Sequence, residues 1–566
     1  DVLGKNGIIS NKLDSYELRP QQMDMALTTE KSIKENKHLI VEAGTGVGKS
    51  MAYLIPFIFW TVKNKKKVII STYTKALQEQ LIKKDLPFLR NALRSVHVDT
   101  CQKNSPAESE QEDKFDFSFA LCVGGQNYLC LRRFNQVQTH GLFETRKETG
   151  EFQEIMEWEE QTKNGLRSEL DFEPSQAVWS KVCRESDLCF GKKCLFIDDC
   201  YYYKARRKEY KAQILVTNHH LFFANLVNEG RVLPNFDAVV FDEAQTLEDV
   251  ATSYFGIEIS NIKVKFLLDS ILNPKTGKGL ITRLFKPSDK TVAAIRETLD
   301  EARQASDLFF SEITEKYGTG SKTTRIRKKG VINNYLSKPL SNLSGALESL
   351  MNLVKPEEER LEIFAFASRC RETNKNISII INQELEDYVY WAEVEKRTNL
   401  PGLLNHKYTR CSLFAAPINI AEDFEKQIFD KIRPVILTSA TLSVNGNFNY
   451  IKERLGISAN HFHQDEFTSG TDMTSDEDFC EKIIGSPFNF SENALIYIPE
   501  YIPDPNQEPD KYKHNIIKHT KDIISHAQGR SFILFTSFKM LNSVYEEIQD
   551  DLDDFTLFKQ GDKPRY

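Results

Sequence analysis

Eight consecutive residues near the start of the chain have the composition of a phosphate-binding turn. They follow the apolar run 38–41 and precede the apolar stretch 51–60, which predict a buried strand and a helix. Glycines let backbone N–H groups close around phosphate oxygens, the lysine adds a cation, and the serine offers a hydroxyl to Mg²⁺. The sequence therefore predicts an ATP-binding P-loop, with a ligand-free glycine turn as the alternative. The residues are Ala43, Gly44, Thr45, Gly46, Val47, Gly48, Lys49 and Ser50, with alanine where the strict pattern has its first glycine.

A second group of polar residues ends another predicted buried strand, 237–241. A carboxylate at such a strand end can hold Mg²⁺ beside a P-loop, and the next carboxylate can polarise an attacking water. We assign Asp242 to the metal and Glu243 to the water, with two solvated acids as the alternative. The two motifs are 193 residues apart, which predicts inserted segments between them.

Length and composition restrict the classes of protein that fit. The 566 residues indicate several domains, and 40% hydrophobic with 27% charged residues is ordinary for globular domains. The apolar stretch 51–60 contains Pro56 and is too short to cross a bilayer. No secretory signal is visible, and the missing initiator Met indicates a start further upstream. A net charge of −7 argues against a general polyanion-coating protein, although a local basic groove stays compatible.

Cysteines are concentrated in one part of the chain. Seven of the ten lie between positions 101 and 200. Cys189, Cys194 and Cys200 form a tight group, and Cys130 lies 59 residues before it. The absence of a C-x₂-C pair and the wide spacing favour a [4Fe–4S] cluster over zinc. Cys183 is a rival fourth ligand, and incidental thiols are the remaining alternative.

Two basic segments are candidates for nucleic-acid contacts. Residues 201–208 read Tyr-Tyr-Tyr-Lys-Ala-Arg-Arg-Lys, in which aromatic rings can stack bases and Arg206 can contact phosphate. The tyrosines can equally pack against the cysteine group. Residues 261–410 carry a net charge of +6, densest at 322–329. A charge run of this kind is as consistent with an ordinary solvated loop.

These motifs, in this order, resemble the iron–sulfur superfamily 2 DNA helicases, above all the bacterial DinG group, which is related to the XPD helicases. Segment 16–22 resembles the family's adenine-binding motif, which assigns Arg19 and Gln22 to ATP. Segment 42–50 resembles motif I. Segment 71–81 resembles motif Ia, which contacts the DNA backbone; its candidates are Thr72, Thr74 and Gln78.

The same resemblance assigns the metal and catalytic residues. Cys130, Cys189, Cys194 and Cys200 match the four cluster ligands, and Cys183 has no counterpart. Residues 242–245 resemble the DEAH box, with Gln245 at its fourth position. A glutamine there can still hydrogen-bond motif III, which 438–442 resemble. Lys49, Ser50, Asp242 and Glu243 keep the roles given above.

The resemblance implies an α/β fold: a RecA-like P-loop motor domain with a parallel sheet, an iron–sulfur insertion, a mostly helical Arch insertion, and the first part of a second RecA-like domain. We expect the following boundaries. Motor domain 1 covers 1–118, 206–259 and 413–448, the iron–sulfur insertion 119–205, the Arch insertion 260–412, and motor domain 2 449–566. Residues 531–537 read as a strand of that second domain, followed by a helix.

The implied activity is ATP-driven, 5′ to 3′ translocation on single-stranded DNA with duplex unwinding, in DNA repair or replication. Implied cofactors are ATP, Mg²⁺ and a [4Fe–4S] cluster; implied partners are single-stranded and forked DNA. We expect a monomer in the bacterial cytoplasm, near the nucleoid, with no membrane association. The alternatives are an ATP-gated, redox-sensitive DNA-binding protein or a non-unwinding translocase, either one attached to an upstream exonuclease. Motifs V and VI, with their arginine finger, are not found in the 566 residues, which predicts weak hydrolysis by this chain alone.

Overall fold

The computed structural model describes residues 2–13, 16–94, 115–141, 143, 145–285, 290–318, 322–397, 408–457, 474–475, 478–552 and 554–561. The chain divides into two compact units. One contains Asp1–Leu170 and Pro174–Pro487, and the other contains Asp171–Glu173 and Phe488–Tyr566.

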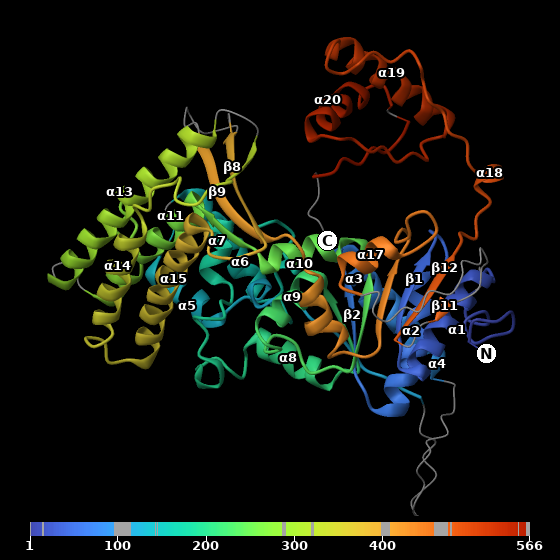
Figure 1. Cartoon of the computed structure of the whole chain (residues 1–566), viewed down its shortest axis with the longest axis horizontal. Helices are drawn as coiled ribbons and strands as arrows, with labels where there is room; N and C mark the ends of the chain where they lie inside the picture. Colours follow the sequence, from blue (N-terminus) through green and yellow to red (C-terminus); the bar gives the residue numbers. More distant parts are fainter. Residues whose placement is uncertain are drawn as a thin grey trace, which may run out of the picture. The chain divides into compact units, whose positions relative to one another are not determined.

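The first unit is built on an eight-stranded sheet with the strand order β11-β12-β1-β10-β5-β2-β4-β3 (Figure 1). All neighbouring strands pair in parallel except β11, which is antiparallel to β12. The predicted α/β class with a parallel sheet is therefore confirmed. The strands are β1 His38–Ala43, β2 Val68–Thr72, β3 Phe119–Leu121, β4 Ile214–Asn218, β5 Ala238–Asp242, β10 Val435–Ser439, β11 Thr474–Ser475 and β12 Phe479–Ile484.

The central strands are continuous apolar runs because a parallel sheet is covered on both faces. Every residue of β2, β5 and β10 is buried. Helix α2, Lys49–Asn64, begins directly after Gly48 and ends before Lys65, whose φ of 53° closes it. The other helices of this region are α1 Pro20–Glu35, α3 Lys75–Gln80, α4 Leu86–Leu93, α9 His219–Val227, α10 Leu247–Phe255, α16 Ala421–Phe424 and α17 Asn449–Arg454. π-Helical turns occupy Leu81–Asp85 and Glu425–Phe429.

The cysteine-rich insertion connects β3 to β4 and is helical. Its helices are α5 Leu131–His140, α6 Arg146–Glu159, α7 Gln176–Val182 and α8 Tyr201–Lys211. Short 3₁₀ turns lie at Gly125–Asn127, Arg167–Glu169 and Gly191–Lys193. The sheet pairs β3 with β4, so residues 119–121 belong to the first sheet and not to the insertion as we expected.

The second insertion combines helices with a separate antiparallel sheet of order β6-β9-β8-β7. Residues 413–417, expected to return to the motor domain, instead complete strand β9 of this sheet, because they pair in register with β8. Buried apolar side chains from both layers form one core. The elements are β6 Ile257–Ser260, α11 Asn261–Ile271, α12 Leu280–Leu284, α13 Lys290–Tyr317, β7 Thr323–Arg325, α14 Ser337–Leu350, α15 Glu357–Asn382, β8 Tyr388–Arg397 and β9 Tyr408–Pro417.

The expected domain boundary at 449 also differs from the structure. Strand β12 pairs with β1 along its whole length, from His38 with Phe479 to Ala43 with Ile484. The first unit therefore extends to Pro487. A strand so distant in sequence joins this sheet because β1 would otherwise be an open edge beside the P-loop.

The second unit contains α18 Phe490–Asn493, α19 Pro509–His526 and α20 Phe538–Ile548. The expected helix after 537 is present, but the expected strand at 531–537 is not. That segment has no ladder partner among the described residues, and Phe532 and Leu534 are 88% and 81% exposed. Strand geometry is stable only when its backbone groups are paired, so the apolar pattern alone does not produce a strand here.

Candidate functional site

The glycine turn between β1 and α2 has the backbone of a phosphate-binding loop. Gly46 and Gly48 have φ values of 83° and 82°, which lie in the left-handed region that favours glycine. A Cβ on Gly48 would collide with Nε2 of Gln22, and one on Gly44 would lie 2.9 Å from the backbone of Ser486. The turn therefore favours glycine at 46 for its conformation, at 44 for space, and at 48 for both reasons.

The two residues expected to contact adenine hold this loop. Nη1 of Arg19 donates to the carbonyl of Gly46 at 2.7 Å, and Nε2 of Gln22 donates to the carbonyl of Gly48 at 3.0 Å. Both come from the start of α1, where Pro20 occupies the first helical position. Arg19 and Gln22 are thus next to the predicted nucleotide site and connect it to α1.

Asp242 lies at the same end of the sheet as the P-loop, where the parallel strands have their carboxyl ends. Strand β10 separates β1 from β5, and all three are parallel, so the P-loop and Asp242 leave the sheet at the same end. Asp242 is only 2% exposed. Burial raises the pKa of Asp242 to about 6, while the hydrogen bond from Tyr53 and the charge of Lys49 oppose this rise.

Two donors fix the Asp242 carboxylate. The Tyr53 hydroxyl donates to Oδ2 at 2.9 Å, and the backbone N–H of Glu243 donates to Oδ1 at 3.0 Å. Tyr53 is fully buried on α2, one turn after Lys49, and its hydroxyl also interacts with Ser50. The carboxylate is therefore oriented toward the start of α2, where Lys49 and Ser50 lie.

The residues after Asp242 form a relay to β10. Glu243 has a φ of 63°, a strained conformation for a residue with a side chain. Nε2 of Gln245 donates to Oε2 of Glu243 at 2.8 Å, and Oε1 of Gln245 accepts from the hydroxyl of Ser439. An amide has both a donor and an acceptor, so Gln245 joins the acidic pair to the end of β10.

Several residues at this edge were not singled out from the sequence. Glu42 accepts backbone N–H groups of Leu442 and Ser443 at 2.6 Å each, which fastens the segment after β10 to the end of β1. Ser71 and His219 join the ends of β2 and β4 at 2.7 Å. A charged residue ending an otherwise apolar strand was the available signal for Glu42, and none identified Tyr53.

The four residues expected to contact DNA have different environments. Thr74 is exposed, and its hydroxyl accepts the N–H of Leu77 as the N-cap of α3. Thr72 and Gln78 are buried, and Nε2 of Gln78 has no hydrogen-bond partner among the described residues. Arg206 is also buried and pairs with Glu209 at 2.5 Å. The structure therefore argues against Arg206 as a phosphate contact, because its guanidinium is already neutralised inside the protein.

The tyrosines before Arg206 also pack internally. Tyr202 forms an edge-to-face contact with Tyr128 at 5.6 Å between ring centroids, and the guanidinium of Arg184 lies 3.8 Å from its ring centroid. These contacts of Tyr202 lie within the protein and argue against base stacking by that ring.

The four expected cluster cysteines are partly exposed, and Cys194 and Cys200 both lie close enough to Cys130 and Cys189 to interact electrostatically. Cys130 and Cys200 directly precede α5 and α8. Burial raises the pKa of both Cys194 and Cys200, and the charges of Cys130 and Cys189 raise it further. Backbone N–H groups after Cys194 and Cys200 lower these pKa values, as donors to a ligating sulfur would.

These features fit a multinuclear cluster, in which each thiolate binds a different iron. Within the part of the chain that the structure describes, no group of three His, Cys, Asp or Glu side chains is arranged to hold one metal ion. Cys183 differs from the other four: it is buried, and its sulfur lies 3.9 Å from Nη1 of Arg133. Cys101 lies outside the described residues.

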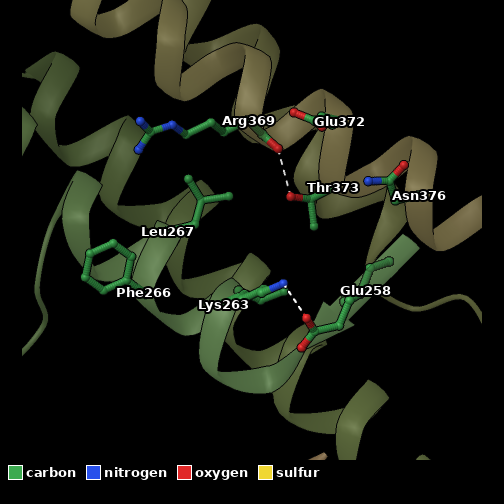
Figure 2. A pocket seen from close by; sticks show the side chains of 10 residues that line it. Glu258, Lys263, Phe266, Leu267, Arg369, Glu372, Thr373 and Asn376 are labelled. Carbon is green, nitrogen blue, oxygen red and sulfur yellow. Dashed lines mark hydrogen bonds and ion pairs between the residues drawn. The ribbon is translucent and has the colours of Figure 1, made fainter. Parts of the chain in front are cut away.

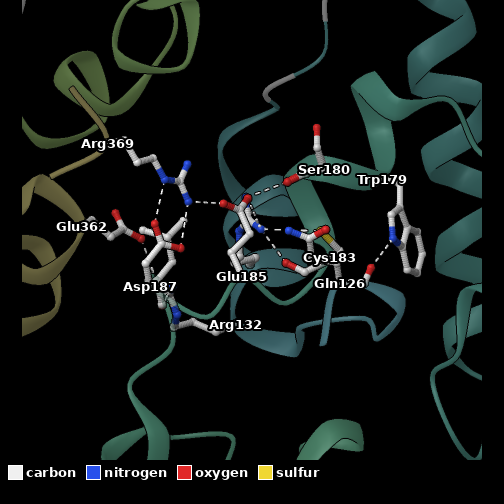
Figure 3. Close-up of polar contacts among 11 residues, drawn as sticks. Gln126, Arg132, Trp179, Ser180, Cys183, Glu185, Asp187, Glu362 and Arg369 are labelled. Carbon is white, nitrogen blue, oxygen red and sulfur yellow. Dashed lines mark hydrogen bonds and ion pairs between the residues drawn. The ribbon is translucent and has the colours of Figure 1, made fainter. Parts of the chain in front are cut away.

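A polar network joins the cysteine segments to α15 of the second insertion (Figure 3). Arg132, two residues after Cys130, pairs with Glu362 at 2.8 Å, and Arg283 pairs with the other oxygen of Glu362. Arg369 binds Asp187 through two hydrogen bonds of 2.7 and 2.9 Å. The segment before Cys189 is therefore held by the same helix as the segment after Cys130.

Arg369 also borders a pocket between α11 and α15 (Figure 2). The pocket has a volume of about 220 Å³. On one side of it Lys263 pairs with Glu258 at 2.7 Å, and on α15 the Thr373 hydroxyl donates to the Arg369 carbonyl at 2.8 Å (Figure 2). Glu372 and Asn376 of α15 also line the pocket.

The parallel sheet, the glycine turn and the acidic strand end together define a P-loop nucleotide-binding protein. The DEAD/DEAH box helicase family model matches residues 23–125, and the DEAD_2 model matches residues 153–264. The chain is thus a relative of the DinG- and YoaA-like helicases that carry DEAD and DEAD_2 regions.

Two curated relatives illustrate this similarity, and one solved structure was also matched. "ATP-dependent DNA helicase YoaA" of Haemophilus influenzae is 27% identical over 97% of this chain and 76% of the relative. "ATP-dependent helicase DinG" of Mycobacterium tuberculosis is 27% identical over 96% of this chain and 75% of the relative. The match to a structure titled "XPD_Helicase" covers 94% of this chain and 75% of the chain in that structure, with a TM-score of 0.45 and 13% identity. None of the described helices is long and apolar enough to cross a bilayer.

Proposed function

We propose that the chain is an ATP-dependent DNA helicase that moves 5′ to 3′ along single-stranded DNA. The observation that carries this proposal is the meeting of Lys49 and Asp242 at one edge of the sheet, linked through Gln245 to Ser439. The relatives named above as ATP-dependent DNA helicases support DNA as the substrate.

The residues present divide the work of ATP hydrolysis. Backbone N–H groups of 44–49 and the ammonium of Lys49 bind the phosphates. The Ser50 hydroxyl and Asp242 would hold Mg²⁺, which supplies charge neutralisation at the phosphate oxygens when bound. Tyr53 keeps Asp242 oriented, and Glu243 accepts a hydrogen bond from the attacking water.

The structural change that hydrolysis causes can be transmitted through the residues at the strand ends. Loss of the terminal phosphate removes the group that Glu243 and its water contact. Because Gln245 bonds both Glu243 and Ser439, this change reaches the segment 439–443, which Glu42 holds to β1. We propose that this relay converts hydrolysis into movement of bound DNA, with the exposed Thr74 of the motif Ia segment near the DNA backbone.

We also propose that Cys130, Cys189, Cys194 and Cys200 hold a [4Fe–4S] cluster. A bound cluster would tie together the starts of α5 and α8 and the 3₁₀ turn at Gly191–Lys193. An iron and sulfide assay on anaerobically purified protein tests this assignment, and zinc without iron would refute it.

Strand displacement on tailed duplexes tests the helicase proposal. For the intact protein we expect ATP-dependent displacement on a duplex with a 5′ single-stranded tail, and none on one with a 3′ tail. Lys49→Ala abolishes both displacement and hydrolysis, whereas Lys63→Ala, an exposed lysine on the same helix, retains them. ATP-dependent DNA binding with no displacement by the intact protein would favour a non-unwinding binding protein.

A further inference from the structure

The edge strand β7 and the turn that follows it carry a run of cations that the nucleotide site does not use. Residues 322–336 contain five lysines or arginines and no acidic residue. Lys322 pairs with Glu395 at 3.6 Å. The other four have no ion-pair or hydrogen-bond partner for their side chains among the described residues. These four, here called the β7 cations, are Arg325, Arg327, Lys328 and Lys329.

The backbone under these side chains is fixed. Ile326 is buried in the core of the insertion, and its N–H donates to the carbonyl of Tyr390 at 2.8 Å. Nε2 of Gln383 donates to the carbonyl of Ile326 at 2.9 Å, and the N–H of Gly330 donates to the carbonyl of Ile381 at 3.0 Å. These bonds fix the backbone at Ile326 and Gly330, so Arg325 at the end of β7 and the three cations of the turn after it are not on a free tether.

Two of the β7 cations border a polar hollow. Arg325, Arg327 and Gln383 line it together with Ile326, Tyr388 and Tyr390, and its volume is about 400 Å³. No carboxylate is among its lining residues. Two guanidiniums beside a hollow without an acid form a site for an anionic group with several acceptor oxygens, since guanidinium forks match phosphate.

Aromatic surface adjoins the same strand. Arg325 lies directly opposite Trp391, which pairs in turn with Phe414 on β9. The rings of Trp391 and Phe414 are stacked, with centroids 5.0 Å apart and planes 8° apart. Directly opposed residues of an antiparallel sheet share a face, so Arg325 and this partly exposed aromatic pair lie side by side. Cations beside stacked aromatics are typical of surfaces that bind single-stranded nucleic acid.

We propose that the β7 cations form a second binding surface for the phosphate backbone of single-stranded DNA, separate from the nucleotide site and the motif Ia segment. The surface is independent of base sequence because its charged groups face phosphates and its rings accept any base. It adds affinity that ATP turnover does not alter, since none of its residues contacts the P-loop or Asp242. The location on an insertion rather than on the motor sheet allows it to hold DNA while the motor releases and rebinds.

The test compares two variants of the full chain with the same loss of charge. One replaces the four β7 cations with Gln. The other replaces four exposed cations elsewhere on the same insertion that have no ion-pair partner among the described residues. Those four are Arg296, Lys338, Lys355 and Lys375. Fluorescence anisotropy with a labelled single strand measures affinity over a series of salt concentrations, and the corresponding duplex is measured in parallel.

We expect the β7 variant to lose about tenfold or more in affinity for the single strand, and its log–log salt slope to fall by about 0.7 for each lost phosphate contact. The control variant, in which the four scattered cations are replaced, keeps most of its affinity and most of its salt slope. Equal losses in the two variants would show a general charge effect and overturn the proposal. Unchanged affinity and slope in the β7 variant would also overturn it and leave an acidic protein as the partner to examine.

Two measurements separate this proposal from the helicase assignment. A fluorescent ATP analogue binds the β7 variant normally, whereas Lys49→Ala loses the analogue and retains the salt slope. A Trp391→Leu variant, which keeps every charge, lowers affinity for the single strand and not for the duplex. Equal effects on both forms of DNA would remove base stacking from the proposal. Matching thermal melting curves for the β7 and scattered variants show that both fold.

Discussion

At the scale of single residues, the nucleotide site depends on backbone conformations that only some residues allow. Gly48 has a φ of 82°, and the side chain of Gln22 occupies the space where a Cβ would lie. Ala43, in contrast, ends a regular strand and is fully buried. The alanine that departs from the strict P-loop pattern therefore occupies a position without conformational demand. This explains why the departure does not disturb the loop.

The contrast between Gly48 and Ala43 gives a direct prediction. Gly48→Ala places a Cβ against Gln22 in a conformation that costs about 1–3 kcal/mol, so ATP affinity falls by roughly tenfold or more. Ala43→Gly costs only strand stability, about 0.5–1 kcal/mol, and keeps nucleotide binding. Titration with a fluorescent ATP analogue measures both variants. Normal binding by Gly48→Ala would show that the loop rearranges before it accepts the ligand.

At the scale of elements, the two insertions are joined by buried charges. Burial alone would raise the pKa of Glu362, but Arg283 and Arg132 lower it, so the carboxylate stays charged between two guanidiniums. Breaking such a buried pair leaves uncompensated charge, which is more costly than losing a surface pair. Helix α15 is therefore the element on which the position of the cysteine segments depends.

Glu362→Gln tests this dependence, because it keeps the side-chain shape and removes the charge. We expect local destabilisation of about 3–5 kcal/mol, seen as faster hydrogen exchange in α5, α15 and residues 183–189. Glu357→Gln is the matched control on the same helix, since its pair with Lys193 is fully exposed and is expected to contribute nothing measurable. Similar exchange in both variants would show that apolar packing alone holds the insertions together.

At the scale of the whole molecule, a buried histidine makes stability depend on pH. Burial, together with the charge of nearby Arg433, lowers the pKa of His38 to about 3. Its ring lies 4.7 Å from that of Phe479, and its Nδ1 accepts the N–H of Val435 at 3.1 Å. His38 thus joins β1 to β10 and β12 in its neutral form.

The sign of the pH effect follows from these pKa values. The unfolded chain binds a proton at His38 below pH 6.5, and the folded chain does so only near pH 3. The contribution to stability is therefore complete above pH 6.5 and is lost as pH falls toward 3, at about 1.4 kcal/mol per pH unit. Urea unfolding gives the free energy of unfolding at each pH in this range. For His38→Asn, the slope of that free energy against pH should be shallower than for the unchanged protein by about 1.4 kcal/mol per pH unit. An unchanged slope would assign acid sensitivity to other groups, such as the buried His219.

The sequence also predicted much of the central sheet, for a physical reason. Fully buried parallel strands are apolar runs, and glycine turns and strand-end acids are local signals that survive without tertiary contacts. The runs 38–41 and 237–241 and the pair Asp242 and Glu243 are examples. The same reasoning wrongly predicted a strand at 531–537. This apolar run forms no strand because it has no neighbouring strand to pair with among the described residues.

Which residues serve each site was decided by tertiary structure. Tyr53 and Asp242 are 189 positions apart, and Glu42 and Leu442 are 400 apart. No local pattern encodes such a pairing, because hydrogen bonds depend on distances that only the folded sheet creates. For the same reason Arg206, a basic residue beside aromatics in the sequence, is an internal ion-pair partner in the fold, while Arg325 and Arg327 remain on the surface. The residue types and their spacing determined which chemistry is available, and burial determined which groups are free to perform it.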